Sequence, residues 1–302
     1  MAWGINLVTS KKDNKLSGLL SNSHQLGETN AQISDKCKTP SIDSIEEVCA
    51  YRKYDDSLSL YSMMANLKKD LLELPCNVHD HTVVKSNLEY MKILARHDIP
   101  TLLIKEILND NGLLETVAAR SYAHVNHFDK IVLIDNPDPR GYRLTLHSWN
   151  KRYDDSIRKE ELIHNHRFSF WSHVYRGRLI SENFIEAKFF SKGRKTLKKF
   201  KYLPSKTGNI HTCTAEGEAQ LIKLDNSYVD EGKTYYLNYN TTHRVILPTN
   251  GKSICTFVLR GPREREYTNT YNTFYPDRGI ESSVPMMTSE QLKNRLINIL
   301  GE

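Results

Sequence analysis

Residues 163–177 read IHNHRFSFWSHVYRG and place two histidines, His164 and His166, two positions apart, ahead of an aromatic run that ends at Gly177. In a β-strand, residues i and i+2 lie on one face about 6.5–7 Å apart, so both imidazoles can reach one metal ion while Asn165 points away. A third ligand has to come from another strand. His243 opens a later β-type run, THRVILP, and we predict that it completes the site.

The sequence around this motif has the composition of a β-rich domain. All nine phenylalanines lie between Phe128 and Phe274. After Asn126, β-branched and aromatic runs alternate with turns rich in Asn, Pro and Gly, without helical patterns between them. The pattern predicts about eight short strands in a sandwich, jelly roll or small barrel.

The rest of the chain divides by composition into a tail and two helical segments. Residues 1–44 are polar, and we predict a disordered N-terminal tail there. Residues 45–121 carry apolar side chains at helical spacing after a Ser-x-x-Glu capping box that begins at Ser44. The barrel is expected over residues 122–280, and a helical segment over 281–302.

Charge and cysteine content narrow the class of protein. A net charge of +6 over 302 residues is too thin to indicate nucleic acid by itself, although residues 191–206 form a basic run. That run is the feature on which a nucleic-acid alternative depends, and a solvated hairpin is the favoured interpretation. The five cysteines are scattered without a CxxC pair, and no long apolar segment is present. We therefore expect a cytoplasmic protein that does not span a membrane.

Two motifs resemble those of the cupin superfamily. His164-Asn165-His166 with the following run to Gly177 is similar to the first cupin metal motif, and residues 242–245 (THRV) are similar to the second. Within the superfamily, residues 142–260 most resemble the cysteine dioxygenase-like, three-histidine group. The resemblance implies a mainly β fold, a cupin (RmlC-like jelly-roll) barrel with an N-terminal α-helical region.

The sequence also departs from that group. Trp171 stands where many cupins have a glutamate ligand, so a three-histidine site is expected. Thiol dioxygenases carry a cysteine at that place and a tyrosine at the position of Arg260. Since both are replaced, cysteine is not the expected substrate.

Counting by twos along two runs predicts the residues around the metal. His147 and Arg143 share one face of their strand, and Trp171 and His173 share a face of theirs. If these faces look into the barrel, they form with Arg260 a substrate site for an anionic or zwitterionic small molecule. The alternatives are structural roles for both histidines, a core role for Trp171 and a solvated Arg143. Further candidate anion anchors are Lys130 and Arg120.

Three neutral imidazoles suit Fe, Ni, Cu or Zn rather than Mg²⁺. The resemblance implies Fe(II), with the catalytic metal on His164, His166 and His243, and the hypothesis is a mononuclear non-haem iron oxygenase, a dioxygenase or hydroxylase. Its partners would be O₂ and a small amino-acid-like or carboxylate-bearing substrate. The alternatives are a non-catalytic metal-binding or ligand-binding cupin, a zinc hydrolase and a nucleic-acid-binding protein. The oligomeric state is left open.

Overall fold

The computed structural model describes residues 61–136, 138, 141–150, 153–187, 194–204, 211–249, 252–273 and 285–301. The predicted N-terminal tail, residues 1–44, lies outside the described residues, as does the start of the predicted helical region.

Helices come first in the described chain. They are α2 (Tyr61–Glu73), α3 (His81–Arg96), α4 (Ile99–Asn109) and α5 (Asn111–Ala118). Asp80 caps α3 by accepting a hydrogen bond from the Thr82 amide, and Asp110 does the same for the Leu113 amide in α5. The short α6 (Asp155–Arg158) lies between strands, and α7 (Ser289–Leu300) begins with a capping box formed by Thr288 and Gln291. Helix α7 lies within residues 281–302, the range for which a helical segment is expected.

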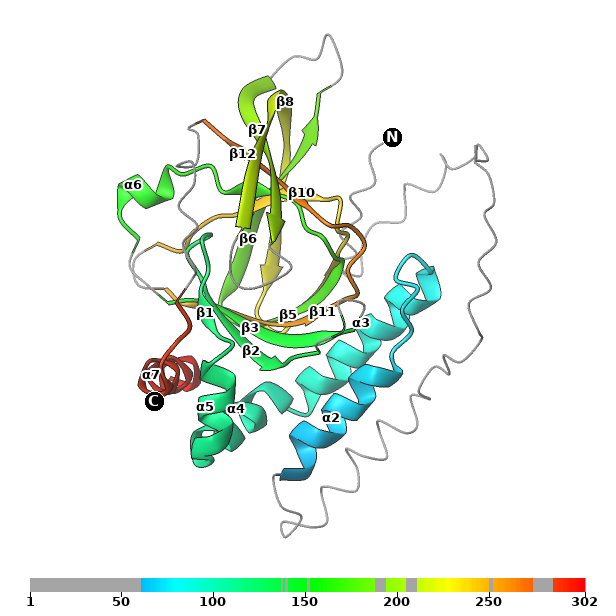
Figure 1. Ribbon diagram of the computed structural model, residues 1–302, viewed down its shortest axis with the longest axis vertical. Helices are drawn as coiled ribbons and strands as arrows, with labels where there is room; N and C mark the ends of the chain where they lie inside the picture. The colour runs from blue at the N-terminus through cyan, green and yellow to red at the C-terminus, as the bar shows by residue number, and fades with distance from the viewer. Residues whose placement is uncertain are drawn as a thin grey trace.

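The strands form two antiparallel sheets. The first has the order β1-β2-β3-β11-β5-β9. Its members are β1 (Tyr122–Ala123), β2 (Asp129–Ile134), β3 (Arg143–Trp149), β11 (Ile254–Arg260), β5 (Phe170–Arg176) and β9 (Thr234–Leu237). Helices α2, α3, α4, α5 and α7 all lie against one face of this sheet (Figure 1).

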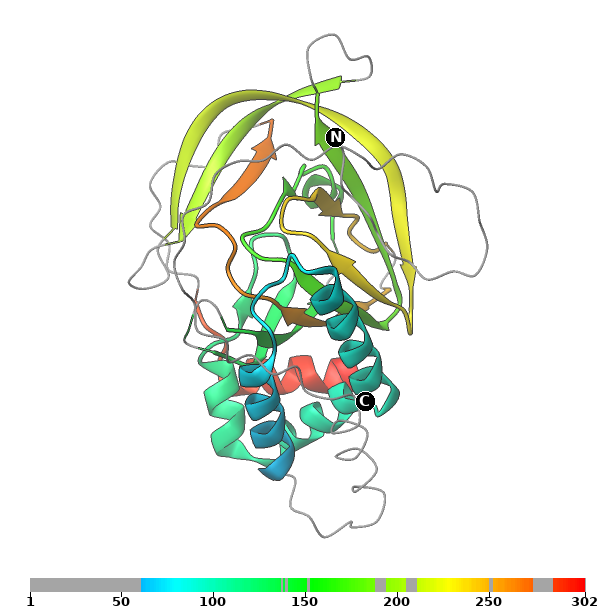
Figure 2. The same ribbon diagram turned by 90° about the vertical axis from the view of Figure 1, so that its right-hand side faces the viewer.

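The second sheet closes on itself in the order β10-β4-β12-β7-β8-β6. Its members are β10 (Thr242–Val245), β4 (Ile163–His164), β12 (Thr268–Asn272), β7 (Arg194–Pro204), β8 (His211–Asp230) and β6 (Arg178–Glu186). In Figure 2 the long strand β8 arches over the end of the molecule opposite the helices.

Three hydrophobic clusters hold these layers together. The largest joins the helices to the outer face of the first sheet, through side chains such as Leu103, Leu144 and Leu292. The second joins the inner faces of both sheets, from Phe170 and Val258 in the first to Leu179 in the second. The third is small and belongs to the closed second sheet. The predicted mainly β barrel with a helical region packed on one side is confirmed.

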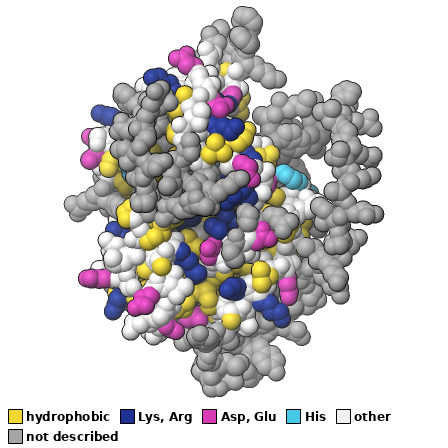
Figure 3. Space-filling view, in the orientation of Figure 1, with side chains coloured by type: hydrophobic (Ala, Val, Ile, Leu, Met, Phe, Trp, Pro, Cys, Tyr) yellow, Lys and Arg dark blue, Asp and Glu magenta, His cyan; other side chains and the backbone are white. Residues whose placement is uncertain are grey.

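The basic run of residues 191–206 falls largely in β7, which pairs with β8 as a hairpin inserted between barrel strands. Two of its lysines have carboxylate partners: Lys195 Nζ lies 2.9 Å from Glu161 and Lys199 Nζ 2.6 Å from Glu186. Phe200, in the same strand, is fully buried. On the face shown in Figure 3, basic and acidic side chains are mixed among the described residues. No helix in the described ranges is long and apolar enough to cross a membrane.

Candidate metal centre

The three histidines predicted as ligands lie together on the inner side of the barrel. His164 ends β4, His166 follows it by two residues, and His243 lies in β10, where it is the Cα partner of His164. Their ligand atoms all lie within 4.8 Å of one another. The ring centroids form a nearly equilateral triangle with sides of 4.8, 5.0 and 5.1 Å. Two strands that are distant in sequence thus bring three imidazoles to one point.

A backbone carbonyl determines which nitrogen His164 presents. Its Nδ1 lies 2.8 Å from the Leu162 carbonyl oxygen, and because a carbonyl only accepts, Nδ1 carries the proton. Nε2 is then free as a ligand. Leu162 has a φ of +51°, in the left-handed region that branched residues seldom adopt. With its backbone in this conformation, Leu162 places its carbonyl oxygen against the imidazole of His164.

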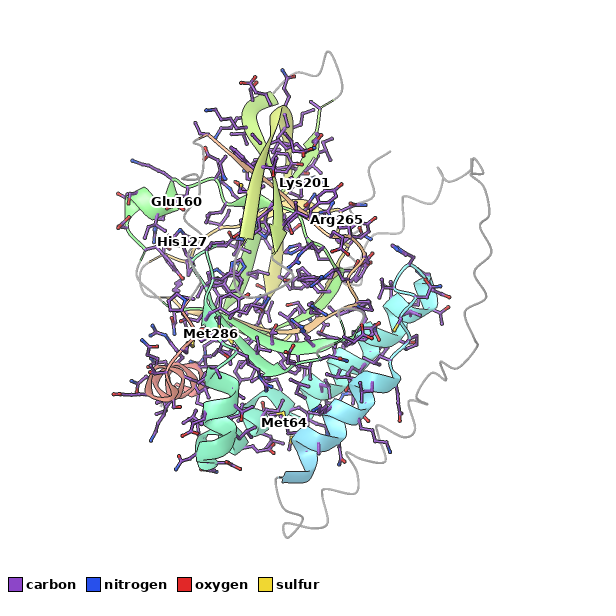
Figure 4. The ribbon with its side chains drawn as sticks, in the orientation of Figure 1. Met64, His127, Glu160, Lys201, Arg265 and Met286 are labelled. Atoms are coloured by element: carbon purple, nitrogen blue, oxygen red, sulfur yellow. The ribbon has the colours of Figure 1, made fainter. Side chains whose placement is uncertain are left out.

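His166 and the residue before it are held through backbone bonds. The His166 amide donates to the Tyr239 carbonyl at 3.0 Å, and its own carbonyl accepts from Arg265 Nε at 2.6 Å. Asn165 is buried, and its side-chain oxygen accepts from the Asn269 amide of β12 at 2.8 Å. Figure 4 labels Arg265 close to Lys201, and both cations lie over the Tyr267 ring. The backbone of His166 is therefore held by Arg265, which precedes β12, and by Tyr239, which precedes β10, while Asn165 is held by β12 itself.

Burial sets the protonation of all three rings. It is the largest cause lowering the pKa of His164, His166 and His243, and for His166 and His243 the neighbouring histidines lower the pKa further. The rings are therefore neutral near pH 7, which is the state that binds metal.

The donor set fits a transition-metal ion. Imidazole nitrogens at about 2.0–2.1 Å from one ion lie about 3–3.5 Å from each other, and His166 Nε2 lies 2.9 Å from His243 Nε2. Three neutral nitrogens with no carboxylate suit Fe, Ni, Cu or Zn. Ligands on one side of the ion leave its remaining positions open to other molecules.

His147 lies on the inner face of the first sheet and within electrostatic reach of His166. Its Cα partner on β2 is Lys130. Burial, and then the Lys130 charge, lowers the pKa of His147 well below its ordinary value. His147 is thus a neutral imidazole beside the three ligands, and its part in substrate binding stays a prediction.

Arg143 and Arg260 are Cα partners on β3 and β11, at one end of the same inner face. Arg143 pairs with Asp135 at 2.5 Å. Arg260 is 6% exposed; its Nη2 donates to the Gly141 carbonyl at 2.7 Å, and its guanidinium lies 5.2 Å from the centre of the Phe168 ring. Burial, followed by repulsion from Arg143, lowers the pKa of Arg260 to about 9.

Trp171 and His173 lie on the opposite face of β5, which corrects the expectation that they surround the metal. Trp171 is fully buried in the cluster shared with the helices, and its Nε1 donates to the Val84 carbonyl of α3 at 3.0 Å. His173 is the Cα partner of Phe257, which belongs to that cluster, and its Nδ1 bonds with Thr234 Oγ1 at 2.9 Å. The inner face of β5 instead carries Phe170 and Val174.

Two residues at the site were missed by the sequence reasoning. Arg167 directly follows the second ligand and has a buried, unpartnered Nη1; its adjacency to the motif was the available signal. Asn126 Nδ2 lies 3.3 Å from both ring nitrogens of His164, and no sequence signal marked it. Arg120, a candidate anchor, instead donates to the carbonyls of Val132 and Leu133.

Comparisons with known proteins give only loose structural matches. No protein-family model matches the sequence, and no curated protein matches it. Hydroxypropylphosphonic acid epoxidase from S. wedmorenis is 9% identical with a TM-score of 0.26, over 46% of this chain and 53% of the epoxidase chain. HEPD from Streptomyces albus, solved with 2-hydroxyethylphosphonate and Fe(II), is 9% identical with a TM-score of 0.25, over 45% and 21%.

A third structure, described as one of DMSP lyases, is 16% identical with a TM-score of 0.24, over 44% of this chain and 47% of its own. The chain thus spans about half or less of the length of these proteins. Superpositions this loose transfer no residue, substrate or metal to the present chain.

Proposed function

We propose that the protein is a mononuclear cupin-type metalloenzyme in which His164, His166 and His243 hold Fe(II) for an oxygenase reaction, a dioxygenation or hydroxylation. The supporting observation is the convergence of three neutral imidazoles, His243 buried and the other two half-buried, on one point. An iron ion bound there would supply open positions at which a substrate and O₂ meet.

The protein's own residues would bind and orient the substrate. Lys130 and Arg260 carry positive charge on the inner face of the barrel, so they favour a small molecule with an anionic group, such as a carboxylate. His147 and the ring of Phe170, which lies 5.1 Å from that of His166, limit the space beside the ligands. Cysteine is not the proposed substrate, because Trp171 occupies the place of the thiol dioxygenase cysteine.

Metal content measured on protein purified without a chelating tag tests the metal part of the proposal. The wild type is expected to hold one Fe per chain after anaerobic loading, and His164→Ala is expected to hold far less. His173→Ala is the matched control, because this histidine lies on the other face of β5. Equal metal content in wild type and His164→Ala would overturn the assignment.

Oxygen uptake by the loaded enzyme tests the oxygenase part. Uptake with a carboxylate-bearing substrate, lost in His164→Ala and kept in His173→Ala, is the expected result. Metal binding without uptake across a screen of amino acids and carboxylates would instead favour a metal-binding cupin without catalysis. Hydrolysis by the zinc-loaded protein would favour the zinc hydrolase.

A further inference from the structure

A group of positively charged side chains lies beside the candidate metal centre, at the end of the inner face that carries Arg143 and Arg260. The positive charges of Arg143, Arg263 and Arg167 are close enough to Arg260 to lower its pKa. The charges of Arg260, Arg143 and Arg167 lower the pKa of Lys130 in the same way. We call Lys130, Arg167 and Arg260 the cation cluster, since within the described ranges no ion pair joins any of the three to a carboxylate.

The cations at the edge of this cluster are already paired. Arg143 contacts Asp135 at 2.5 Å, and Arg263 lies 3.9 Å from Glu266. These carboxylates are engaged with other arginines, although the charge of Asp135 also acts on Arg260 and that of Glu266 on Arg167. The cluster retains an excess of positive charge inside the protein, where repulsion between like charges is screened less than in water.

Two donors of the cluster are buried and unpartnered. Arg260 Nε and Arg167 Nη1 have no hydrogen-bond partner among the described residues. Leaving a charged donor unbonded inside a protein is costly, and an Arg fork matches the oxygens of a carboxylate or phosphate. Arg260 is also fixed in place by the Gly141 carbonyl and by the Phe168 ring. Its free donor is thus held ready for an acceptor oxygen.

The position of Lys130 connects the cluster to the metal centre. Its charge acts on His166 as well as on His147, its Cα partner. It also lies within reach of Arg260. A molecule held by the arginines would therefore extend past Lys130 toward the three histidines.

From this arrangement we propose that the cation cluster binds a substrate group carrying two negative charges, either a phosphate or phosphonate or a pair of carboxylates. A single carboxylate would satisfy one guanidinium and leave the second arginine and Lys130 uncompensated. A doubly charged group offers enough oxygens for Arg260 and Arg167 together and balances more of the excess charge. The inference rests on the proposed function for its substrate, but the binding itself does not require the metal.

Calorimetric titration of the metal-free protein with inorganic phosphate, malonate and acetate at constant ionic strength tests the proposal. Phosphate or malonate is expected to bind at least about tenfold more tightly than acetate. Tighter binding of phosphate would identify a phosphorus-containing group, and tighter binding of malonate a pair of carboxylates. Equal binding of all three anions, or no binding of any, would overturn the proposal.

Charge-removing variants locate the binding. Arg260→Gln and Arg167→Gln are each expected to weaken binding of the preferred anion at least about tenfold, with metal content unchanged. Arg178→Gln is the matched control, because Arg178 is an exposed cation that pairs with Asp230 away from the cluster. If Arg260→Gln does not fold, Arg167→Gln and the charge-keeping Arg260→Lys carry the test. Unchanged affinity in Arg167→Gln would overturn the assignment.

The ligand variant separates this proposal from the proposed function. His164→Ala is expected to lose metal and to keep the wild-type anion affinity. Loss of anion binding in metal-free His164→Ala would place the anion on the histidines and overturn the cation cluster. Conversely, a wild-type protein that binds phosphate or malonate but no metal would support anion binding by the cation cluster and would contradict the proposed metalloenzyme.

Discussion

The Nε2 atom of His166, two residues past the end of β4, faces that of His243 in β10 at 2.9 Å. Burial lowers the pKa of both residues well below the ordinary value for histidine. Two neutral imidazoles at this separation can share either one proton or one cation. Since His164 adds a third nitrogen nearby, a divalent metal ion satisfies all three lone pairs together.

Metal binding is expected to stabilise the fold. Because a metal that binds only the folded state adds to its stability, a free concentration of 100 times Kd contributes about 2.7 kcal/mol. Adding Fe(II) without oxygen, or Zn(II) in air, should raise the Tm of the wild type by several degrees. His166→Ala should lose most of this rise, and differential scanning calorimetry measures both.

His173→Ala serves as the control, since it removes a half-buried histidine on the other face of β5. The same rise in Tm in His173→Ala as in the wild type is expected. A rise that persists in His166→Ala would show that the ion stabilises the protein from another place.

The grouping of the three histidines could be predicted from the sequence because part of its geometry is local. Strand periodicity alone places His164 and His166 on one face, and a β-rich chain can return His243 to them. Strand periodicity could not predict which side chains of the next strand, β5, face the inside of the barrel. Between His166 and Phe170 the chain leaves the strand conformation, so counting by twos does not carry across. The face of Trp171 was decided by the helices that cover the first sheet.

The strand pairing of the closed second sheet is another feature that could not be predicted from the sequence. Its small core includes apolar residues set singly among polar ones, such as Leu197 in the lysine-rich β7 and Tyr271 in β12. Isolated apolar residues give no clear alternation over these runs. Only long-range pairing, such as that of Tyr271 in β12 with Ile163 in β4, brings them together.

Trp171 should matter for stability rather than for metal binding. Trp171→Ala removes a fully buried ring between the first sheet and α3, so we expect it to lower the free energy of unfolding by about 3–5 kcal/mol. Metal content per folded chain should be unchanged. Urea denaturation and metal analysis of the same preparation check this. If Trp171→Ala keeps its stability but loses activity, the result would instead support the original prediction that Trp171 lines the substrate site.

Leu162 should act on the metal through the His164 ring. Leu162→Pro fixes φ near −65°, which is incompatible with the observed +51° and moves the carbonyl away from His164 Nδ1. Because losing such a hydrogen bond typically costs 10- to 100-fold in metal affinity, we expect a loss of about that size in a metal titration. Leu162→Gly permits the same φ and should keep the affinity. Equal affinities for the two variants would contradict a positioning role.

Glu182 should make stability depend on acid pH. It lies in β6 beside Arg244, the residue after His243, and its Oε2 accepts from Arg244 Nε at 2.5 Å while Lys223 contacts Oε1. Burial by itself would raise the pKa of Glu182, but the bonds to Lys223 and Arg244 outweigh it, so the pKa is lowered. A carboxyl group whose pKa is lower in the folded state stabilises the protein above its unfolded pKa of about 4.3. This contribution is lost as the pH falls through the folded pKa.

Glu182→Gln should therefore lower the free energy of unfolding by about 2 kcal/mol at pH 7. The difference from wild type should shrink as the pH falls below about 4, because protonation then neutralises the wild-type carboxylate as well. Urea denaturation across this pH range measures the effect. A difference that stays constant from pH 7 to pH 3 would mean that the packing of the side chain, and not its charge, joins β6 to β10.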